Sequence, residues 1–270
     1  MQDYCNVAFL FWTDNSNFHP FLIEIKMKKI QISLVSVGTI KYPVNFGYLE
    51  HWSSRIIMIR HGASIGQIPN AEGSDWEYPN EQLAKIIKRD ATADITVALI
   101  NVKLEANYYM RRLGDNVAVL SLYEMADIIR FSDFTVENYI LRNLYELVVL
   151  YTANNQVLPT SAYTWAHDEV RGCLFDMNAS KPDIIFSMHR PILCHACRNR
   201  VLGSQVDVGF LPALYKELSR IRKALFFRII DWIKRHPLWV LVITALSGIL
   251  VNLISSIIFG KIMKVCPWIG

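Results

Sequence analysis

Four residues of the amino-acid sequence have the types and the spacing to hold a metal ion. Cys194 and Cys197 form a Cys-x2-Cys pair, which can grip one Zn²⁺ from a tight turn. Cys173 lies 21 residues before this pair, and His167 lies six residues before Cys173. One imidazole and three thiolates make a complete tetrahedral donor set. The sequence therefore predicts a zinc site built from His167, Cys173, Cys194 and Cys197.

This donor set would close the coordination sphere of the metal. A zinc ion with four protein ligands has no position left for water, so it stabilises a fold and does not catalyse a reaction. Two alternatives stay open: His195, inside the turn, is a ligand, or Cys173 is a small core residue and no metal binds. Three nearby carboxylates either orient the histidine or are ordinary solvated charges: Asp168, Glu169 and Asp176.

The segments upstream of this set alternate between strand-like and helix-like patterns. Short apolar runs predict four strands, over residues 30–37, 55–60, 94–101 and 116–122, of which the first is buried and the third is central. Amphipathic spacing predicts helices over 80–89 and, most strongly, over 135–151, where Thr135 offers an N-terminal cap. Such alternation is typical of an α/β fold. We therefore expect an α/β domain over residues 28–160, followed by a zinc-knuckle segment over 161–205.

The last sixty residues carry two further helical patterns. Residues 211–236 combine apolar residues at helical spacing with many basic residues, which predicts a basic amphipathic juxtamembrane helix. This helix either lies in the interface of an anionic leaflet or packs on the domain or on a copy of itself. Residues 238–260 contain no charge and no histidine, and a helix of that length crosses a hydrocarbon core of about 30 Å. We expect a transmembrane helix there and a short tail over 261–270.

Within the predicted span, small and polar residues recur at every fourth position, which places them in one row on a helix. Small residues let two helices approach closely in lipid, and an Asn in the middle of a membrane needs a hydrogen-bonding partner. We therefore expect a homo-oligomer that forms through this row: Thr244, Gly248, Asn252, Ser256 and Gly260.

Charge and composition limit where the protein is and what it binds. The net charge of +4 is too small to indicate a nucleic-acid-binding protein. Basic residues flank the predicted span, so we expect a tail-anchored protein on the cytoplasmic side of a membrane, the inner membrane if the source is bacterial. Clustered cysteines fit metal ligation in a reducing compartment better than disulfides. Residues 1–27 resemble no signal peptide and are predicted to be an N-terminal extension.

The order of these features resembles the archaemetzincins, small metalloproteases with one catalytic zinc and a second, Cys-rich zinc site. The resemblance covers residues 94–202. It includes the strand at 94–101, the helix at 135–151, the sequence Cys173-Leu-Phe-Asp-Met and the late Cys194-x2-Cys197 pair. It implies a relative that kept the structural metal site of that family.

The catalytic motif of that family is missing from the matching helix. The family needs His-Glu-x-x-His there and a third histidine beyond it, whereas this chain has Tyr145-Glu-Leu-Val-Val and then Asn155. Glu146 stands where the general base would be, but no histidines are present to hold an open zinc. Arg60-His61-Gly62 is similar to the phosphohistidine phosphatases, yet no second histidine matches their pattern. We therefore predict no catalytic residues.

Together these features predict a non-enzymatic, membrane-tethered protein. We expect its α/β domain to bind a small-molecule or protein ligand and its zinc knuckle to connect that domain to the anchor. Copies that assemble in the bilayer would then act as an effector or regulator. A further hypothesis is a scaffold protein that binds no ligand. The alternative is an anchored zinc-dependent hydrolase of the archaemetzincin type, with a site near Glu146, His167 and Glu169. A second zinc with peptidase activity would favour the hydrolase.

Overall fold

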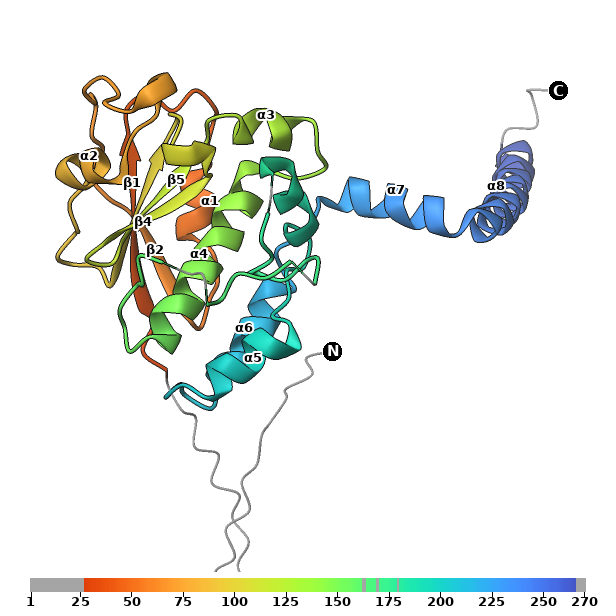
Figure 1. The fold of residues 1–270 in the computed structure, drawn as a ribbon. Helices are drawn as coiled ribbons and strands as arrows, with labels where there is room; N and C mark the ends of the chain where they lie inside the picture. Colours follow the sequence, from red (N-terminus) through yellow and green to blue (C-terminus); the bar gives the residue numbers. More distant parts are fainter. Residues whose placement is uncertain (1–26, 162–163, 169, 179, 266–270) are drawn as a thin grey trace, which may run out of the picture.

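The computed structural model describes residues 27–265 except 162, 163, 169 and 179, and of residues 262–265 it describes only the backbone. The predicted N-terminal extension therefore lies outside the described residues apart from Met27, and so do Cys5 and Cys266. The described chain forms a sheet flanked by helices, then a helical segment packed below the sheet, and finally two helices that extend away from this globule (Figure 1).

A five-stranded sheet lies at the centre of the globule. Its order is β2-β1-β3-β5-β4, with four parallel strands and one antiparallel edge strand, β4. β3 and β5 are buried along their whole length, as expected for strands covered on both faces. The strand bounds are β1 Ile30–Val37, β2 Ile57–His61, β3 Ile95–Ile100, β4 Met110–Gly114 and β5 Val117–Ser121. The predicted α/β fold is confirmed.

Helices cover both faces of the sheet. Figure 1 shows α2 on one side and α1 with α4 on the other, and the buried residues of these helices fall into two separate apolar clusters. The bounds of these helices are α1 Phe46–Glu50, α2 Asn80–Ile86, α3 Met125–Arg130 and α4 Val136–Ala153. Three short 3-10 turns lie in the connections: Ser74–Trp76, Glu105–Asn107 and Lys181–Ser187.

The long helix α4 organises the larger cluster. Thr135 caps its N-terminus by accepting a hydrogen bond from the backbone N–H of Asn138, as predicted. Every residue from 139 to 151 is buried. The Tyr145 hydroxyl donates to the Glu217 carboxylate at 2.6 Å and accepts from the Trp52 indole N–H at 2.8 Å. This network ties α4 to the segment before β2 and to the C-terminal helices.

The predicted amphipathic helix over 211–236 is not continuous. The structure has α6 at Phe210–Leu218 and α7 at Leu225–Arg235, with a non-helical connection between them. Ile221 in that connection is buried, and its carbonyl accepts a hydrogen bond from the backbone N–H of Arg190 at 2.6 Å. The chain leaves the helical path because these contacts outweigh local propensity. α6 therefore belongs to the globule, and α7 extends from it (Figure 1).

The chain continues into α8, Pro237–Val265, after the single residue His236. Proline at the first helical position is favourable because its missing N–H would have no partner there. The stretch Pro237–Lys261 spans 25 residues, is long and apolar enough to cross a membrane, and has none of its most apolar window buried against the rest of the structure. Length and composition alone identify it as a candidate span.

Candidate metal centre

The Cys-x2-Cys pair lies at the N-terminus of α5, His195–Leu202. Cys194 is the N-cap residue, and its sulfur accepts a hydrogen bond from the backbone N–H of Cys197 at 3.5 Å. The pair therefore replaces the usual oxygen cap with sulfur. The N–H groups and the dipole at a helix start favour negative charge, so this position suits a metal-bound sulfur.

The other two residues come from the loop between α4 and α5. The backbone of His167 pairs with that of Asp176, and the backbone of Cys173 pairs with that of Ile192. These two short bridges fold the loop back on itself, so residues distant in sequence meet in front of α5. Trp165 packs on Phe175 with ring centroids 4.8 Å apart. The loop is thus held by backbone pairing and apolar packing together.

The structure brings all four predicted ligands together. The ligand atoms of His167, Cys173, Cys194 and Cys197 lie within 4.8 Å of one another. The Cys194 Sγ and the His167 Nε2 are 3.4 Å apart. A zinc ion with bonds of about 2.0–2.3 Å would hold its ligand atoms roughly 3.5–4 Å apart, so one ion fits with small adjustments. Three soft sulfurs and one imidazole suit zinc, and the arrangement suggests zinc binding.

Hydrogen bonds within the cluster distinguish its thiols. The Cys197 thiol donates to the Cys173 sulfur, and this bond, assisted by the backbone N–H of Cys194 at 3.4 Å, lowers the pKa of Cys173 to about 5. The same bond raises the pKa of Cys197. Of these two sulfurs, Cys173 is therefore the first to become a thiolate. Metal binding would then displace the proton that Cys197 retains.

The remaining histidines near the segment lie outside the cluster. His195 is exposed on α5, with its Nδ1 3.4 Å from the Asn199 amide nitrogen. His189 accepts a hydrogen bond from the backbone N–H of Lys223 at 3.3 Å. The structure thus assembles the set with His167 and leaves out His195. Among the residues that the structure describes, it contains no further group of three or more metal-ligating side chains.

One carboxylate is enclosed beside the cluster. Asp176 is buried, whereas Asp168 is exposed and Glu169 lies outside the described residues. Neither carboxylate oxygen of Asp176 has a hydrogen-bond partner within the described part of the chain, and the nearest guanidinium, of Arg171, is 3.8 Å away. Burial raises the pKa of Asp176. Its backbone pairs with that of His167, but its carboxylate makes no hydrogen bond to the His167 imidazole.

A buried arginine, not anticipated from the sequence, pins the metal-binding loop to the core. Arg142 of α4 has no exposed surface and donates to the Leu174 carbonyl, next to Cys173. Its guanidinium also donates to the Ser187 hydroxyl at 3.0 Å and forms an ion pair with Glu146. The i, i+4 spacing of opposite charges on a helix was the available signal, but that pattern usually marks a surface pair.

Two of the residues that the sequence associated with catalysis, Glu146 and His61, contact other side chains of the fold. Glu146, at the position of the general base in the archaemetzincin motif, is 7% exposed and pairs with Arg142. His61 stacks on Phe46 with ring centroids 4.0 Å apart, and its Nε2 is 3.3 Å from the Ser36 hydroxyl. The Glu146 ion pair is buried, whereas His61 is exposed at the end of β2.

No protein-family model matches the chain, and no curated protein matches it either. A search of solved structures finds the crystal structure of archaemetzincin from Methanopyrus kandleri, with a TM-score of 0.42 and 14% sequence identity. The match covers 65% of this chain and 94% of that one. The match is consistent with a distant resemblance to archaemetzincin.

Proposed function

We propose that the chain is a zinc-stabilised binding protein that its C-terminal helix tethers to a membrane, with no catalytic role of its own. The exposure of α8 carries this proposal. Its large apolar side chains are uncovered from Leu238 to Phe259. An apolar surface of that extent is not left in water by a soluble monomer, so it needs lipid or protein around it. A 25-residue apolar helix matches the thickness of a bilayer.

The helix before the span supports an interfacial position. One side of α7 exposes large apolar residues, whereas its last turn is basic with Lys234 and Arg235. Such a helix lies in the plane of a headgroup layer, and each basic residue near an anionic surface contributes about 1 kcal/mol. The apolar residues concerned are Leu225, Phe226, Ile229, Trp232 and Ile233. Basic residues on this flank favour a cytoplasmic globule.

The metal centre has a structural role in this proposal. The four residues that would hold zinc fill a tetrahedral set, and bound zinc would supply cross-linking energy to the fold. Cys173, Cys194 and Cys197 belong to the same apolar cluster as α4 and α6. The site would therefore fasten the C-terminal segment, which leads to the anchor, onto the α/β domain.

The contacts of Glu146 support a non-catalytic role over the hydrolase alternative. A general base must reach a water on an open metal, but this carboxylate is buried and paired with Arg142. The four-ligand set also leaves no coordination position for that water.

Self-association in the membrane is part of the proposed function. A Cβ added at Gly248 or Gly260 would meet nothing within 4 Å, so the row has room for a neighbouring helix. The Asn252 side chain makes no hydrogen bond with the described residues, unlike Thr244 and Ser256, whose hydroxyls donate to carbonyls of their own helix. In lipid that amide would gain from a partner in a second copy. Assembly would make the protein an effector or regulator.

Membrane attachment is tested by fractionation of the full chain. We expect the protein to stay in the membrane pellet after alkaline carbonate extraction. Replacing both Leu246 and Ile254 with Arg should release it, because each central charge costs about 2.5–3.5 kcal/mol. The exchange Leu246→Ile with Ile254→Leu is the matched control and should change nothing. A wild-type chain that is monodisperse in buffer without detergent would refute the proposal.

The metal is tested by elemental analysis of the purified chain. We expect one zinc per chain, no peptidase activity, and loss of zinc in Cys194→Ser, while His195→Ala keeps its zinc. Gly248→Leu should change the oligomer size in detergent and leave the zinc content unchanged. A second, easily chelated zinc together with peptide cleavage would instead support the hydrolase.

A further inference from the structure

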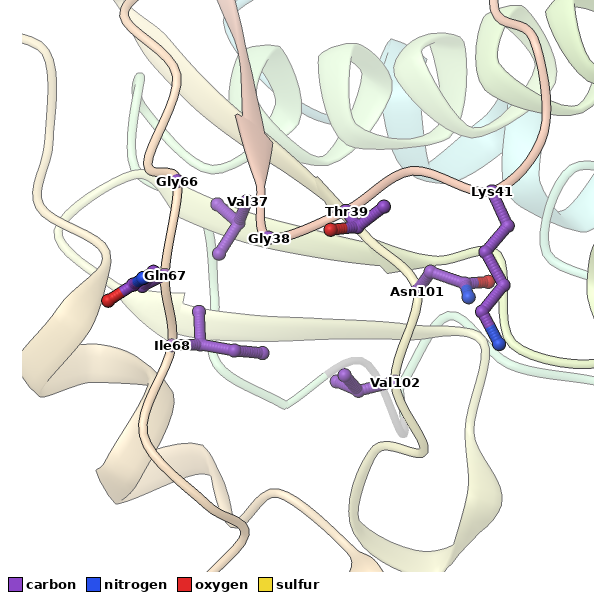
Figure 2. Close-up of a pocket in the computed structure, with 9 residues that line it drawn as sticks. All are labelled: Val37, Gly38, Thr39, Lys41, Gly66, Gln67, Ile68, Asn101 and Val102. Carbon is purple, nitrogen blue, oxygen red and sulfur yellow. The ribbon is translucent and has the colours of Figure 1, made fainter.

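A hollow lies at the carboxyl ends of β1 and β3. Its volume is about 390 Å³, and three separate stretches of chain line it. Val37 to Lys41 continues from β1, Asn101 with Val102 continues from β3, and residues 66–68 follow β2. Figure 2 shows these stretches converging from different sides. Neither the zinc cluster nor any residue with a suspected catalytic role contributes to it.

The hollow lies at the point where the chain reverses the direction in which it adds strands to the sheet. The chain passes from β1 to its neighbour β2 through α1, and then from β2 across β1 to β3 through α2. Leu49 of α1 and Leu83 of α2 belong to different apolar clusters, so the two connections run over opposite faces. In parallel sheets the crevice at such a reversal, beyond the carboxyl ends of the strands, is where ligands bind.

The polar side of the hollow consists of groups without a partner. Within the described part of the chain, the side chains of Thr39, Lys41 and Asn101 make no hydrogen bond or ion pair. Lys41 is the one charged residue in the lining, and no carboxylate faces it there. In Figure 2 the Asn101 amide extends toward the Lys41 side chain, whose ammonium group lies beyond it, whereas Gln67 is directed away. An ammonium group and a carboxamide so placed can bind an anionic group.

The opposite side is apolar. Val37, Ile68 and Val102 contribute this wall, as Figure 2 shows. Gly38 adopts φ +67°, and this left-handed turn carries the chain from β1 into the polar side. A volume near 390 Å³ falls in the range of about 300–1,000 Å³ that small-molecule sites occupy, and mixed apolar and polar walls are their usual lining.

We propose that this hollow, the switch-point pocket, binds a small organic anion with a flat or apolar body. Lys41 and Asn101 would hold a phosphate or carboxylate group, and Val37, Ile68 and Val102 would pack on the body of the ligand. This assignment deepens the proposed function, since it names the ligand class and the place where the α/β domain binds it.

Binding is tested on the full chain in detergent micelles by ligand-observed saturation-transfer NMR. Two anions serve as probes: adenosine 5′-monophosphate for phosphate and orotate for carboxylate. Adenosine and uracil are their uncharged counterparts. We expect at least one anion to bind at least fivefold more tightly than its counterpart, and the anion that does so identifies the preferred group.

Substitutions in the lining test whether the anion binds at the switch-point pocket. Lys41→Gln and Asn101→Ala should each reduce the advantage of the anion several-fold. Lys85→Gln, an exposed lysine on α2 away from the lining, is the matched control and should retain it. The proposal is wrong if neither anion exceeds its counterpart, or if the advantage survives Lys41→Gln or is lost equally in Lys85→Gln. Zinc content and membrane fractionation of the same samples show separately whether the proposed function stands.

Discussion

The buried ion pair between Arg142 and Glu146 leads to a strong prediction about stability. Both charges lie inside the larger apolar cluster, with exposed side-chain fractions of 0% and 9%. Burial by itself lowers the pKa of Arg142, but the Glu146 carboxylate together with Tyr109 and Tyr139 outweighs that effect, and the net pKa is raised. Arg142→Met would remove the compensating charge and leave Glu146 alone in the core.

The expected loss of stability in Arg142→Met follows from the buried groups that this substitution leaves without a partner. An uncompensated buried charge costs about 3–5 kcal/mol, against a total stability of about 5–15 kcal/mol for a folded domain. The Leu174 carbonyl and the Ser187 hydroxyl also lose a donor. In the double variant Arg142→Met with Glu146→Leu no charge remains, so we expect it to lose only about 1–2 kcal/mol.

The assay is urea unfolding of the full chain in a mild detergent, followed by near-ultraviolet circular dichroism. Arg198→Met, an exposed arginine on α5, is the control and should stay within about 0.5 kcal/mol of the wild type. If Arg142→Met were as stable as the wild type, or if the double variant lost the sum of both single losses, the ion pair would not have the role described.

Three further predictions follow from contacts elsewhere. Tyr145→Phe removes a hydrogen bond to the buried Glu217 carboxylate and should cost about 1.5–3 kcal/mol in urea unfolding, while zinc content stays unchanged. Thr135→Ala removes the cap of α4 and should cost about 1 kcal/mol, with Thr135→Ser restoring most of it. The hydrogen bond from Lys223 lowers the pKa of Asp231, so the contact stabilises α7 above pH about 4 and weakens as the pH falls through the lowered value. Amide protection of α7 should therefore decrease below pH 4, and Asp231→Asn should abolish that dependence.

Much of the sheet could be predicted because its strands are short apolar runs. β1, β3 and β5 lie within a residue of the predicted bounds, since strands buried on both faces need apolar residues throughout. β4 was not predicted, because Met110–Gly114 contains two arginines and forms a strand only by pairing with β5. α3 was missed for a related reason: a six-residue helix is too short to form without its packing partners.

The candidate metal ligands could be found because thiol and imidazole spacing is a local property of the sequence. The switch-point pocket could not be found from the sequence, because three separate stretches of chain line it and only the strand order brings them together. Arg142 illustrates a third case. Its sequence context is that of an ordinary amphipathic helix, and only the loop that folds over α4 makes it a buried group.

The one-residue joint at His236 has a mechanical consequence. α7 is 11 residues long and thus about 16 Å from end to end, and it is attached to the globule at one end and to α8 at the other. Lys223 bridges Asp231 on α7 and Asp133 ahead of α4, at 2.9 and 2.8 Å, so this arm is braced where it leaves the globule. A tilt or rotation of α8 would therefore be transmitted to the globule, because α7 is a rigid helix and not a flexible linker. In the proposed membrane position of α8, motion of this helix and displacement of the globule would be coupled in both directions.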